Sequence, residues 1–320
     1  MPLYGTTTAW LKNKTYRPPL PSAEELLELK RATNTSTTVC LPALNEEATI
    51  EGICRSIRRD LVDGVGLVDE LLVVDSGSHD RTAEIASAAG AAVVDASSVL
   101  SDAPCGSGGG KGAALWKSLH VTTGDVLVWL DSDVTNFSPR FVCGLLWPLL
   151  LDPDVHMTKA FYQRPLQGQK DGPPGGGRVT EMTARPLLQL LLPDLGGIVQ
   201  PLAGECAIRR STARSLPFIT GYGVDVALLI DLVQSRGLDA LAQVDLGRRA
   251  HRNKTTDELG RMAFEVARAI LSRAEAAGEI KLAHQLPEGL IQFDPTGANM
   301  HSLAPAELPP MEVFRPRAET

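Results

Sequence analysis

One short stretch constrains the fold more than any other: the apolar run 126–130 (VLVWL) ends at Asp131 and, two residues on, Asp133. Such a run, rich in β-formers, predicts a strand buried on both faces of a sheet. Residues two apart on a strand point the same way, so both carboxylates are expected together at the carboxyl edge. Two carboxylates held together repel each other without a cation. The pair therefore predicts a divalent cation or a sugar nucleotide, with an ordinary acidic turn as the alternative.

Strand and helix patterns alternate on the N-terminal side of this motif. Strands are expected at 37–41, 70–74 and 91–94, and a helix at 80–89. Asn45 is expected to cap the helix that follows the first strand. This alternation is typical of a parallel, doubly wound α/β sheet.

Composition excludes several classes of protein. With 320 residues, 43% hydrophobic and 22% charged, the chain is expected to be a soluble globular protein. Its net charge of −7, without a long basic run, argues against nucleic-acid partners. No apolar segment reaches the roughly 20 residues of a membrane span, and the N-terminus lacks a signal core, so a cytoplasmic location is expected. The five cysteines, without C-x-x-C spacing, are expected to be reduced thiols: Cys40, Cys54, Cys105, Cys143 and Cys206.

Polar clusters follow the predicted strands and are expected to meet at one edge of the sheet. They are 41–47 (LPALNEE), 75–80 (DSGSHD) and the glycine loop 106–112 (GSGGGKG). Backbone amides of such a loop, with Lys111, are suited to cradle a diphosphate. A flexible surface loop with an incidental lysine is the alternative.

The glycine loop resembles two known phosphate-binding motifs in part, the P-loop and the dinucleotide-binding fingerprint. A P-loop requires glycine at position 105 and Ser or Thr at 112, where the chain has Cys and Gly. A dinucleotide fingerprint fits better, at Gly108, Gly110 and Ala113, with Asp131 downstream. However, the polar residues 97–107 include Pro104, so no strand is expected to lead into the turn. A dinucleotide-dependent oxidoreductase remains a less favoured alternative.

Together, the motifs LPALNEE (41–47), VDSGS (74–78), GKG (110–112) and DSD (131–133) resemble the GT-A glycosyltransferases. Further motifs resemble the glucosyl-3-phosphoglycerate synthases: GGGRVTE (175–181), QPLAGE (200–205), GYG (221–223) with LLID (228–231), and RAHRN (249–253). The mannosyl-3-phosphoglycerate synthases of the same retaining family fit nearly as well. The resemblance covers about residues 20–275, in the same order.

The resemblance implies a GT-A fold: a Rossmann-like, mostly parallel sheet flanked by helices, with a C-terminal helical extension. It implies a hexose donor, UDP-glucose or GDP-mannose, 3-phosphoglycerate as acceptor, and Mg²⁺ or Mn²⁺. Asp133 and His251 would hold the metal, and an imidazole beside a carboxylate suits Mn²⁺ better. The implied donor-binding residues are Pro42, Ala43, Leu44, Asn45, Glu46, Ser76, Gly77, Lys111, Asp131, Ser132 and Asp133.

The remaining implied roles concern the reaction and the acceptor. The catalytic residues would be Asp131, Asp133, Lys111, Asp225 and Leu202, with Glu205 near the donor sugar. The acceptor-binding residues would be Gly177, Arg178, Val179, Thr180, Arg249 and Asn253. A guanidinium and a hydroxyl suit a phosphate. Since no carboxylate is placed as an obvious nucleophile, same-face attack is favoured over double displacement.

The chain departs from the glucosyl enzymes at two positions. Asp225 stands where they carry Glu, and Cys206 where an aromatic residue is expected. A carboxylate shortened by one methylene shifts its contacts with sugar hydroxyls, so the donor, UDP-glucose or GDP-mannose, stays open. A nucleotide-sugar-binding or regulatory protein that has lost turnover, or one that uses another acceptor, is the competing class.

Three segments are expected: a leader at 1–35, a GT-A catalytic domain at 36–253, and a helix with a Pro-rich tail at 254–320. Within the domain, 36–133 would form the nucleotide-sugar half and 134–253 the acceptor half. Apolar residues from Leu259 to Leu271 recur at helical spacing and predict a packing face. We expect a homodimer, with the tail as a candidate for wrapping a neighbouring subunit. The product would be a precursor of glucosylglycerate-type compatible solutes or methylglucose polysaccharide.

Overall fold

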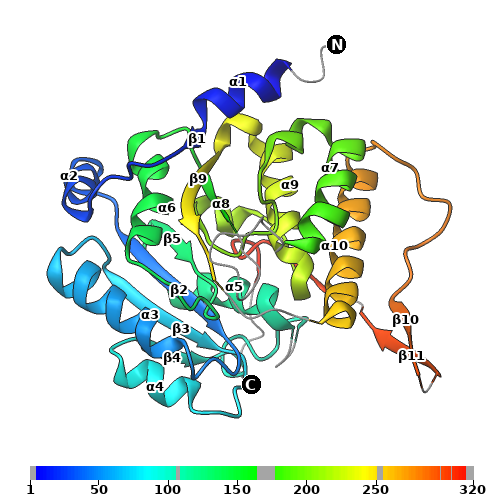
Figure 1. Cartoon of the computed structure of the whole chain (residues 1–320), viewed down its shortest axis with the longest axis horizontal. Helices are drawn as coiled ribbons and strands as arrows, with labels where there is room; N and C mark the ends of the chain where they lie inside the picture. Colours follow the sequence, from blue (N-terminus) through cyan, green and yellow to red (C-terminus); the bar gives the residue numbers. More distant parts are fainter. Residues whose placement is uncertain are drawn as a thin grey trace.

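The computed structural model describes residues 5–105, 109–163, 177–250, 255–295, 297–303 and 305–314. Its main sheet contains β1 (Thr15–Tyr16), β2 (Thr37–Ala43), β3 (Glu70–Asp75), β4 (Ala92–Asp95), β5 (Val126–Trp129), β6 (Met157–Gln163), β7 (Cys206–Arg209) and β9 (Leu241–Arg248). The strand order in this eight-stranded sheet is β1-β9-β6-β7-β5-β2-β3-β4 (Figure 1). β7 runs antiparallel to both neighbours, and the other pairs are parallel. The mostly parallel sheet agrees with the prediction.

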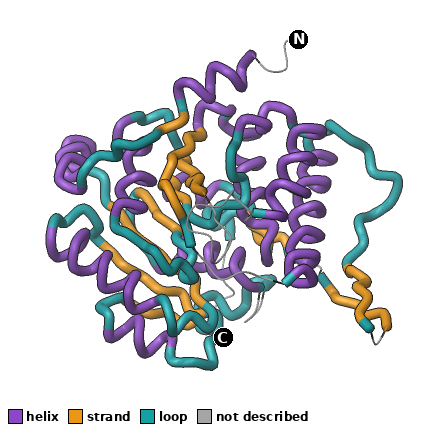
Figure 2. The backbone as a smooth tube through the Cα atoms, in the orientation of Figure 1, coloured by secondary structure: helices purple, strands orange, loops and turns teal. Residues whose placement is uncertain are grey.

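Helices cover the sheet (Figure 2). The α-helices are α1 (Gly5–Asn13), α2 (Ala23–Thr33), α3 (Ile50–Ser56), α4 (Thr82–Ala88), α5 (Gly110–Val121), α6 (Arg140–Leu151), α7 (Arg185–Leu191), α8 (Arg210–Ser215), α9 (Val224–Arg236) and α10 (Thr256–Ala276). The π- and 3₁₀-helical segments are η2 (Ile57–Gly64), η3 (Thr180–Ala184), η4 (Pro193–Gly197), η5 (Gly221–Gly223) and η6 (Leu238–Ala240). Within the described residues, no helix combines the length and apolar character needed to cross a membrane.

Alternating side chains divide the central strands between two apolar layers. In β5, Val126 and Val128 join one buried cluster, whereas Leu127 and Trp129 join the other. The first cluster includes residues of α2, α3, α4 and α6, and the second includes residues of α5, α7, α9 and α10. The run 126–130 is therefore buried on both faces, as its sequence predicted.

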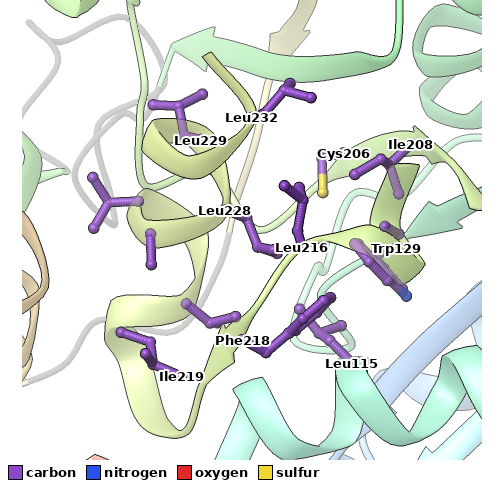
Figure 3. Packing of buried hydrophobic residues seen from close by; sticks show 14 of the residues in the cluster. Leu115, Trp129, Cys206, Ile208, Leu216, Phe218, Ile219, Leu228, Leu229 and Leu232 are labelled. Carbon is purple, nitrogen blue, oxygen red and sulfur yellow. The ribbon is translucent and has the colours of Figure 1, made fainter. Parts of the chain in front are cut away.

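The second cluster shows how the layers interlock. Trp129 of β5 meets Phe218 edge to face, with ring centroids 6.1 Å apart, and Leu228 lies nearby on α9 (Figure 3). Phe218 belongs to β8 (Phe218–Ile219), which pairs with β12 (Glu307–Leu308) of the tail. Because these side chains are almost fully buried, α5, β8 and α9 are fixed relative to the strands that end at Asp131 and Asp133.

The first and last described segments pack against the central sheet and its helices. Trp10 of α1 is 2% exposed, and its indole N–H donates to the Leu241 carbonyl oxygen at 2.7 Å. In the tail, Leu308 is fully buried, and Phe314 packs edge to face on Trp116 at 4.9 Å. Residues 305–314 thus pack on their own chain. The wrapping of the tail over a neighbouring subunit stays a prediction.

Three local predictions need correction. Asn45 does not cap α3, the helix that follows β2. This helix begins at Ile50, and Asn45 has φ +57°. The reason is tertiary, because Asn45 Oδ1 accepts the His79 N–H at 2.8 Å and so joins two loops. The tail is less irregular than expected, since β10 (Gly289–Asp294) and β11 (Gly297–Ser302) form a hairpin. The strand predicted at 91–94 is β4, one residue later.

The contact between α5 and β8 leaves no room for a side chain at Gly112. A Cβ added there would lie 1.9 Å from the Ile219 carbonyl oxygen. We expect Gly112→Ala to lower the free energy of unfolding by about 1–3 kcal/mol, because β8 must shift. Gly52→Ala is the matched control, because Gly52 lies in α3 with nothing within 4 Å of the added Cβ. This change should raise the free energy of unfolding by about 0.5–1 kcal/mol, since alanine favours a helix over glycine. Urea unfolding measures both, and equal effects would contradict the steric reason.

Candidate functional site

Charged side chains from five parts of the chain meet at the carboxyl edge of the sheet. Asp131 and Asp133 follow β5, and Arg249 follows β9. Lys111 and Asp225 are the second residues of α5 and α9. Glu205 precedes β7, whose antiparallel direction brings its first residue to this same edge. Of the three polar clusters predicted to meet at this edge, the glycine loop contributes Lys111 to this set.

Arg249 bridges the two aspartates. Its Nη2 atom donates to Asp131 Oδ2 at 2.9 Å and to Asp133 Oδ1 at 2.8 Å. One nitrogen therefore serves both carboxylates, which must face the same point, as their spacing predicted. The Arg249 side chain is 3% exposed, and those of Asp131 and Asp133 are 25% and 26% exposed.

The same arginine neutralises a fully buried carboxylate. Arg249 Nε lies 2.5 Å from Glu205 Oε1, and Glu205 is 0% exposed. The other carboxylate oxygen, Oε2, accepts the Tyr162 hydroxyl at 2.6 Å. The guanidinium also lies over the Tyr162 ring, 5.5 Å from its centroid. A charge without water is tolerated only when paired in this way.

A second set of ion pairs surrounds Asp225. Lys111 Nζ donates to Asp225 Oδ2 at 3.0 Å and to Asp131 Oδ1 at 2.9 Å. Lys159, on β6, donates to Asp225 Oδ1 at 3.3 Å and is 1% exposed. Both oxygens of Asp225 are thus held by lysines, and Lys111 joins this pair to the aspartates after β5.

Burial and charge act in opposite directions on the two bridging cations. Burial lowers the pKa of Lys111, but Asp131 and Asp225 outweigh it, and the pKa lies well above its ordinary value. The pKa of Arg249 is likewise raised well above its usual range, because Glu205, Tyr162, Asp131 and Asp133 outweigh its burial. Both side chains therefore stay protonated at neutral pH.

The expected donor-binding loops lie against each other. The Asn45 N–H donates to Ser78 Oγ at 2.9 Å, and Ser78 Oγ donates to Asp75 Oδ1 at 2.5 Å. Ser132 reaches the first loop, since its hydroxyl donates to the Pro42 carbonyl oxygen at 2.5 Å. Leu44, Asn45 and Gly77 are exposed, Ala43 is buried, and Pro42, Glu46 and Ser76 are partly buried. Together these loops form a polar, partly exposed strip beside Asp131.

The expected acceptor residues are only partly described. Gly177 is half-buried and Arg178 is exposed at the start of the segment that leads into η3, which packs against α7 and α10. Val179 and Thr180 are buried, the latter 3% exposed. Arg249 lies at the carboxylate cluster described above, and Leu202 lies partly buried in the turn before Glu205. Asn253 and most of the glycine-rich segment before Gly177 lie outside the described residues.

The donor set fits a hard divalent cation in its chemistry. Asp131 and Asp133 offer carboxylate oxygens to one point, at which a cationic nitrogen of Arg249 already lies. In the described part of the chain, no three His, Cys, Asp or Glu side chains gather closely enough to hold a metal. His251, the second expected ligand, lies outside the described residues, so the pairing of Asp133 with His251 stays a prediction.

A separate surface hollow lies at the other edge of the sheet. Its volume is about 510 Å³, and its lining includes Lys30, Ser36, Gly66, Asp69 and Asp125, at the amino ends of the strands. Lys30 is already paired with Asp69 at 2.7 Å. The gathered carboxylates, rather than this hollow, therefore mark the candidate active site.

Sequence reasoning missed two residues of the charged cluster, Lys159 and Tyr162. Both lie on β6, whose sequence MTKAFYQ carries no motif, although a lysine within a buried strand is itself unusual. Its burial signals a carboxylate partner, and only the fold identifies that partner as Asp225.

Comparisons with known proteins agree with this geometry. The family described as Glycosyl transferase family 2 matches residues 38–165. A glucosyl-3-phosphoglycerate synthase of Mycobacterium tuberculosis is 48% identical over 296 residues, which cover 91% of this chain and 89% of that protein. A crystal structure of that organism's enzyme, in complex with Mn²⁺, UDP-glucose and phosphoglyceric acid, has a TM-score of 0.83 at 44% identity and covers 94% of this chain and 99% of that one.

A mannosyl-3-phosphoglycerate synthase is also similar. Its crystal structure, from Rubrobacter xylanophilus, has a TM-score of 0.87 at 36% identity and covers 97% of this chain and 99% of that one. Fold, site and likenesses together define a glycosyltransferase with the GT-A fold. Within that class, the chain belongs to the glucosyl-3-phosphoglycerate synthase family.

The burial of the Arg249–Glu205 pair allows the effect of removing its cation on stability to be predicted. Arg249→Met leaves the fully buried Glu205 without its cation and should lower the free energy of unfolding by about 3–5 kcal/mol. Adding Glu205→Gln should restore at least about 1 kcal/mol, because the amide is neutral and still accepts the Tyr162 hydroxyl. Chemical denaturation measures both variants. If the double variant were no more stable than the single one, the stranded charge would not be the cause.

The control for this experiment is an exposed ion pair. Arg55 pairs with Glu51 one turn away on α3 at 2.7 Å, and their side chains are 66% and 54% exposed. Arg55→Met should change the free energy of unfolding by less than about 0.5 kcal/mol.

Proposed function

We propose that the chain transfers glucose from UDP-glucose to 3-phosphoglycerate with retention of configuration, and that GDP-mannose is the alternative donor. The observation that carries the proposal is the junction of Lys111, Asp131, Asp225 and Arg249 at the edge where a nucleotide sugar is expected. It is supported by the names and bound ligands of the similar enzymes.

The donor is expected to span the site from the loops to α9. The nucleoside would lie on the polar strip formed by Asn45, Ser76 and Gly77, and the sugar beside Lys111 and Asp225. Asp133 and His251 would hold Mg²⁺ or Mn²⁺, which offsets the charge of the diphosphate. Bound ligands must exchange partners with the ion pairs already present, because each of these carboxylates is engaged by a lysine or an arginine.

The acceptor carries a carboxylate and a phosphate, so its pocket needs cations. Arg178 is exposed at the start of its helical segment, and it remains our candidate for the phosphate, with Thr180 and Asn253. Thr180 is 3% exposed, so its hydroxyl reaches a ligand only if the segment before η3 moves. Arg249 is instead held by three carboxylates, and we assign it chiefly to their neutralisation.

The paired state of the carboxylates supports same-face attack. Asp131, Glu205 and Asp225 are each in contact with a cation, which weakens any of them as a nucleophile. In this mechanism the bond from the anomeric carbon to the diphosphate oxygen breaks, and the acceptor hydroxyl oxygen bonds to that carbon on the same face. The hydroxyl proton passes to the leaving diphosphate. The chain contributes orientation and charge stabilisation.

The first experiment measures nucleoside diphosphate release by the purified chain with 3-phosphoglycerate and Mg²⁺ or Mn²⁺. Release from UDP-glucose should require both the metal and the acceptor and should exceed release from GDP-mannose. Asp133→Asn should lower turnover by about 100-fold or more, since the metal contributes several kcal/mol. Asp95→Asn is the matched control, because Asp95 also ends a strand at this edge but its carboxylate accepts its hydrogen bonds locally, from the N–H and hydroxyl of Ser97.

Each outcome of that assay decides one part of the proposal. Faster release from GDP-mannose would reassign the donor and attribute the change to the shorter carboxylate of Asp225. Nucleoside diphosphate release that does not depend on 3-phosphoglycerate would overturn the assignment of 3-phosphoglycerate as the acceptor. No release from either donor would favour a binding or regulatory protein without turnover.

We also propose a homodimer in the cytoplasm, whose product feeds the synthesis of glycosylated compatible solutes. The hairpin β10–β11 projects beside the first turns of α10 (Figure 1). Ile291 and Met300 are cross-strand partners, and Phe293 shares their face; they are 51%, 69% and 77% exposed. The other face is anchored to α10, where Gln292 Nε2 donates to the Asp257 carbonyl oxygen at 3.0 Å. The hairpin thus presents an apolar face that a second copy would cover.

Light scattering tests the dimer. The expected mass is twice the 34.2 kDa of one chain, and Phe293→Asp with Met300→Asp should reduce it to that of one chain. Leu190→Asp, a change at an equally exposed apolar residue (78%) on α7, should leave the mass unchanged. A wild-type monomer, or a dimer that survives the hairpin changes, would overturn this surface.

A further inference from the structure

The helical segment that carries Asp225 begins without a cap from its own sequence. Thr220 occupies the N-cap position of η5, with φ −69° and ψ 161°, but its side chain makes no capping bond. Its hydroxyl oxygen instead accepts the Ala306 N–H of the tail at 2.8 Å. The first N–H groups of a helix have no acceptor within the helix, so they need one from elsewhere.

Glu265 of α10 supplies an acceptor. The Tyr222 N–H donates to Glu265 Oε2 at 2.6 Å, between residues 43 apart in sequence. The approach is close: Gly221 has φ +79°, and a Cβ added there would lie 2.2 Å from Glu265 Oε2. A carboxylate that accepts a backbone N–H makes a charge-assisted hydrogen bond, and the helix dipole favours it at a helix start. Glu265 therefore caps the turn from a different helix.

The same turn is joined to the start of α5. The Gly221 N–H donates to the Gly109 carbonyl oxygen at 3.0 Å, and Gly109 directly precedes the helix whose second residue is Lys111. Asp225 is the second residue of α9, and the two side chains pair at 3.0 Å. The turn Gly221–Gly223 thus connects the two helix starts whose charges meet in the site, while α9 and α10 lie side by side (Figure 1).

We propose that Glu265 is a positioning residue for the donor sugar. By holding the backbone of the Gly221–Gly223 turn, it fixes Asp225 against Lys111, where the sugar of the nucleotide donor is expected. The inference rests on the proposed function, because it takes Asp225 and Lys111 as the groups that hold that sugar.

The test separates sugar binding from nucleotide binding. Glu265→Ala should raise the KM for UDP-glucose about tenfold, the size expected for one charge-assisted hydrogen bond. The Kd of UDP with Mn²⁺, measured by calorimetry, should stay within about twofold, because UDP lacks the sugar. Glu265→Gln keeps an acceptor oxygen and should remain within about threefold of the wild-type KM.

The matched control is Glu275→Ala on the same helix. Glu275 Oε1 accepts the Leu282 N–H at 3.0 Å, a bond of the same kind away from the site. It should lower the thermal unfolding midpoint without changing the KM for UDP-glucose.

The outcomes are distinct. An unchanged KM in Glu265→Ala, or equal KM changes in both alanine variants, would overturn the positioning role. Should Glu265→Ala not fold, Glu265→Asp replaces it: the carboxylate, one methylene shorter, loses its reach to the Tyr222 N–H and should give the same rise in KM, and an unchanged KM would overturn the role. A failure of the proposed function is recognised separately, since wild type would then release no UDP when 3-phosphoglycerate is present.

Discussion

The guanidinium of Arg249 is the contact on which the polar end of the molecule depends. Nearly excluded from water, it lies between Glu205 on one side and Asp131 and Asp133 on the other. Without a cation at this point, three carboxylates from two strand ends would repel one another where little water screens them. The apolar layers on both faces of the sheet bring these strand ends together. The positive charge of the arginine then offsets the repulsion between the carboxylates. The arrangement of the carboxylates at the carboxyl edge of the sheet thus depends on one side chain, that of Arg249, which follows β9.

This arrangement sets terms for ligand binding. Each carboxylate of the cluster already contacts a lysine or an arginine, so in the proposed function a nucleotide sugar and its metal would replace existing ion pairs rather than add to them. The loss of Lys111–Asp131 or Arg249–Asp133 contacts offsets part of the energy gained from the ligand. In the proposed function, the ion pairs would hold the charged side chains in place beforehand, which reduces reorganisation during the reaction.

The sequence allowed much of this to be predicted where the signal is local. The run ending at Asp131 indicated a buried strand, because a short apolar run rich in β-formers suits a strand that is buried on both faces. Sequence patterns did not predict the structure where a residue's contacts come from a part of the chain that is distant in sequence. Asn45 has the chemistry of a helix cap, yet its amide oxygen bonds to the His79 N–H from the neighbouring loop. Nothing near Tyr222 reveals that Glu265, on another helix, completes its turn. Lys159 and Tyr162 joined the site only when β6 was placed next to β7.

The tail contact at Trp116 gives the chain an internal optical signal. The indole N–H donates to the Pro309 carbonyl oxygen at 2.8 Å, and the ring of Phe314 meets it edge to face. Indole emission responds to such surroundings. Trp10 and Trp147 lie in α1 and α6, whereas Trp129 of β5 packs on Phe218, whose strand pairs with the tail. Release of residues 305–314 would therefore change the surroundings of Trp116 directly and those of Trp129 through β8, so indole fluorescence can follow the attachment of β12 in real time without any substrate.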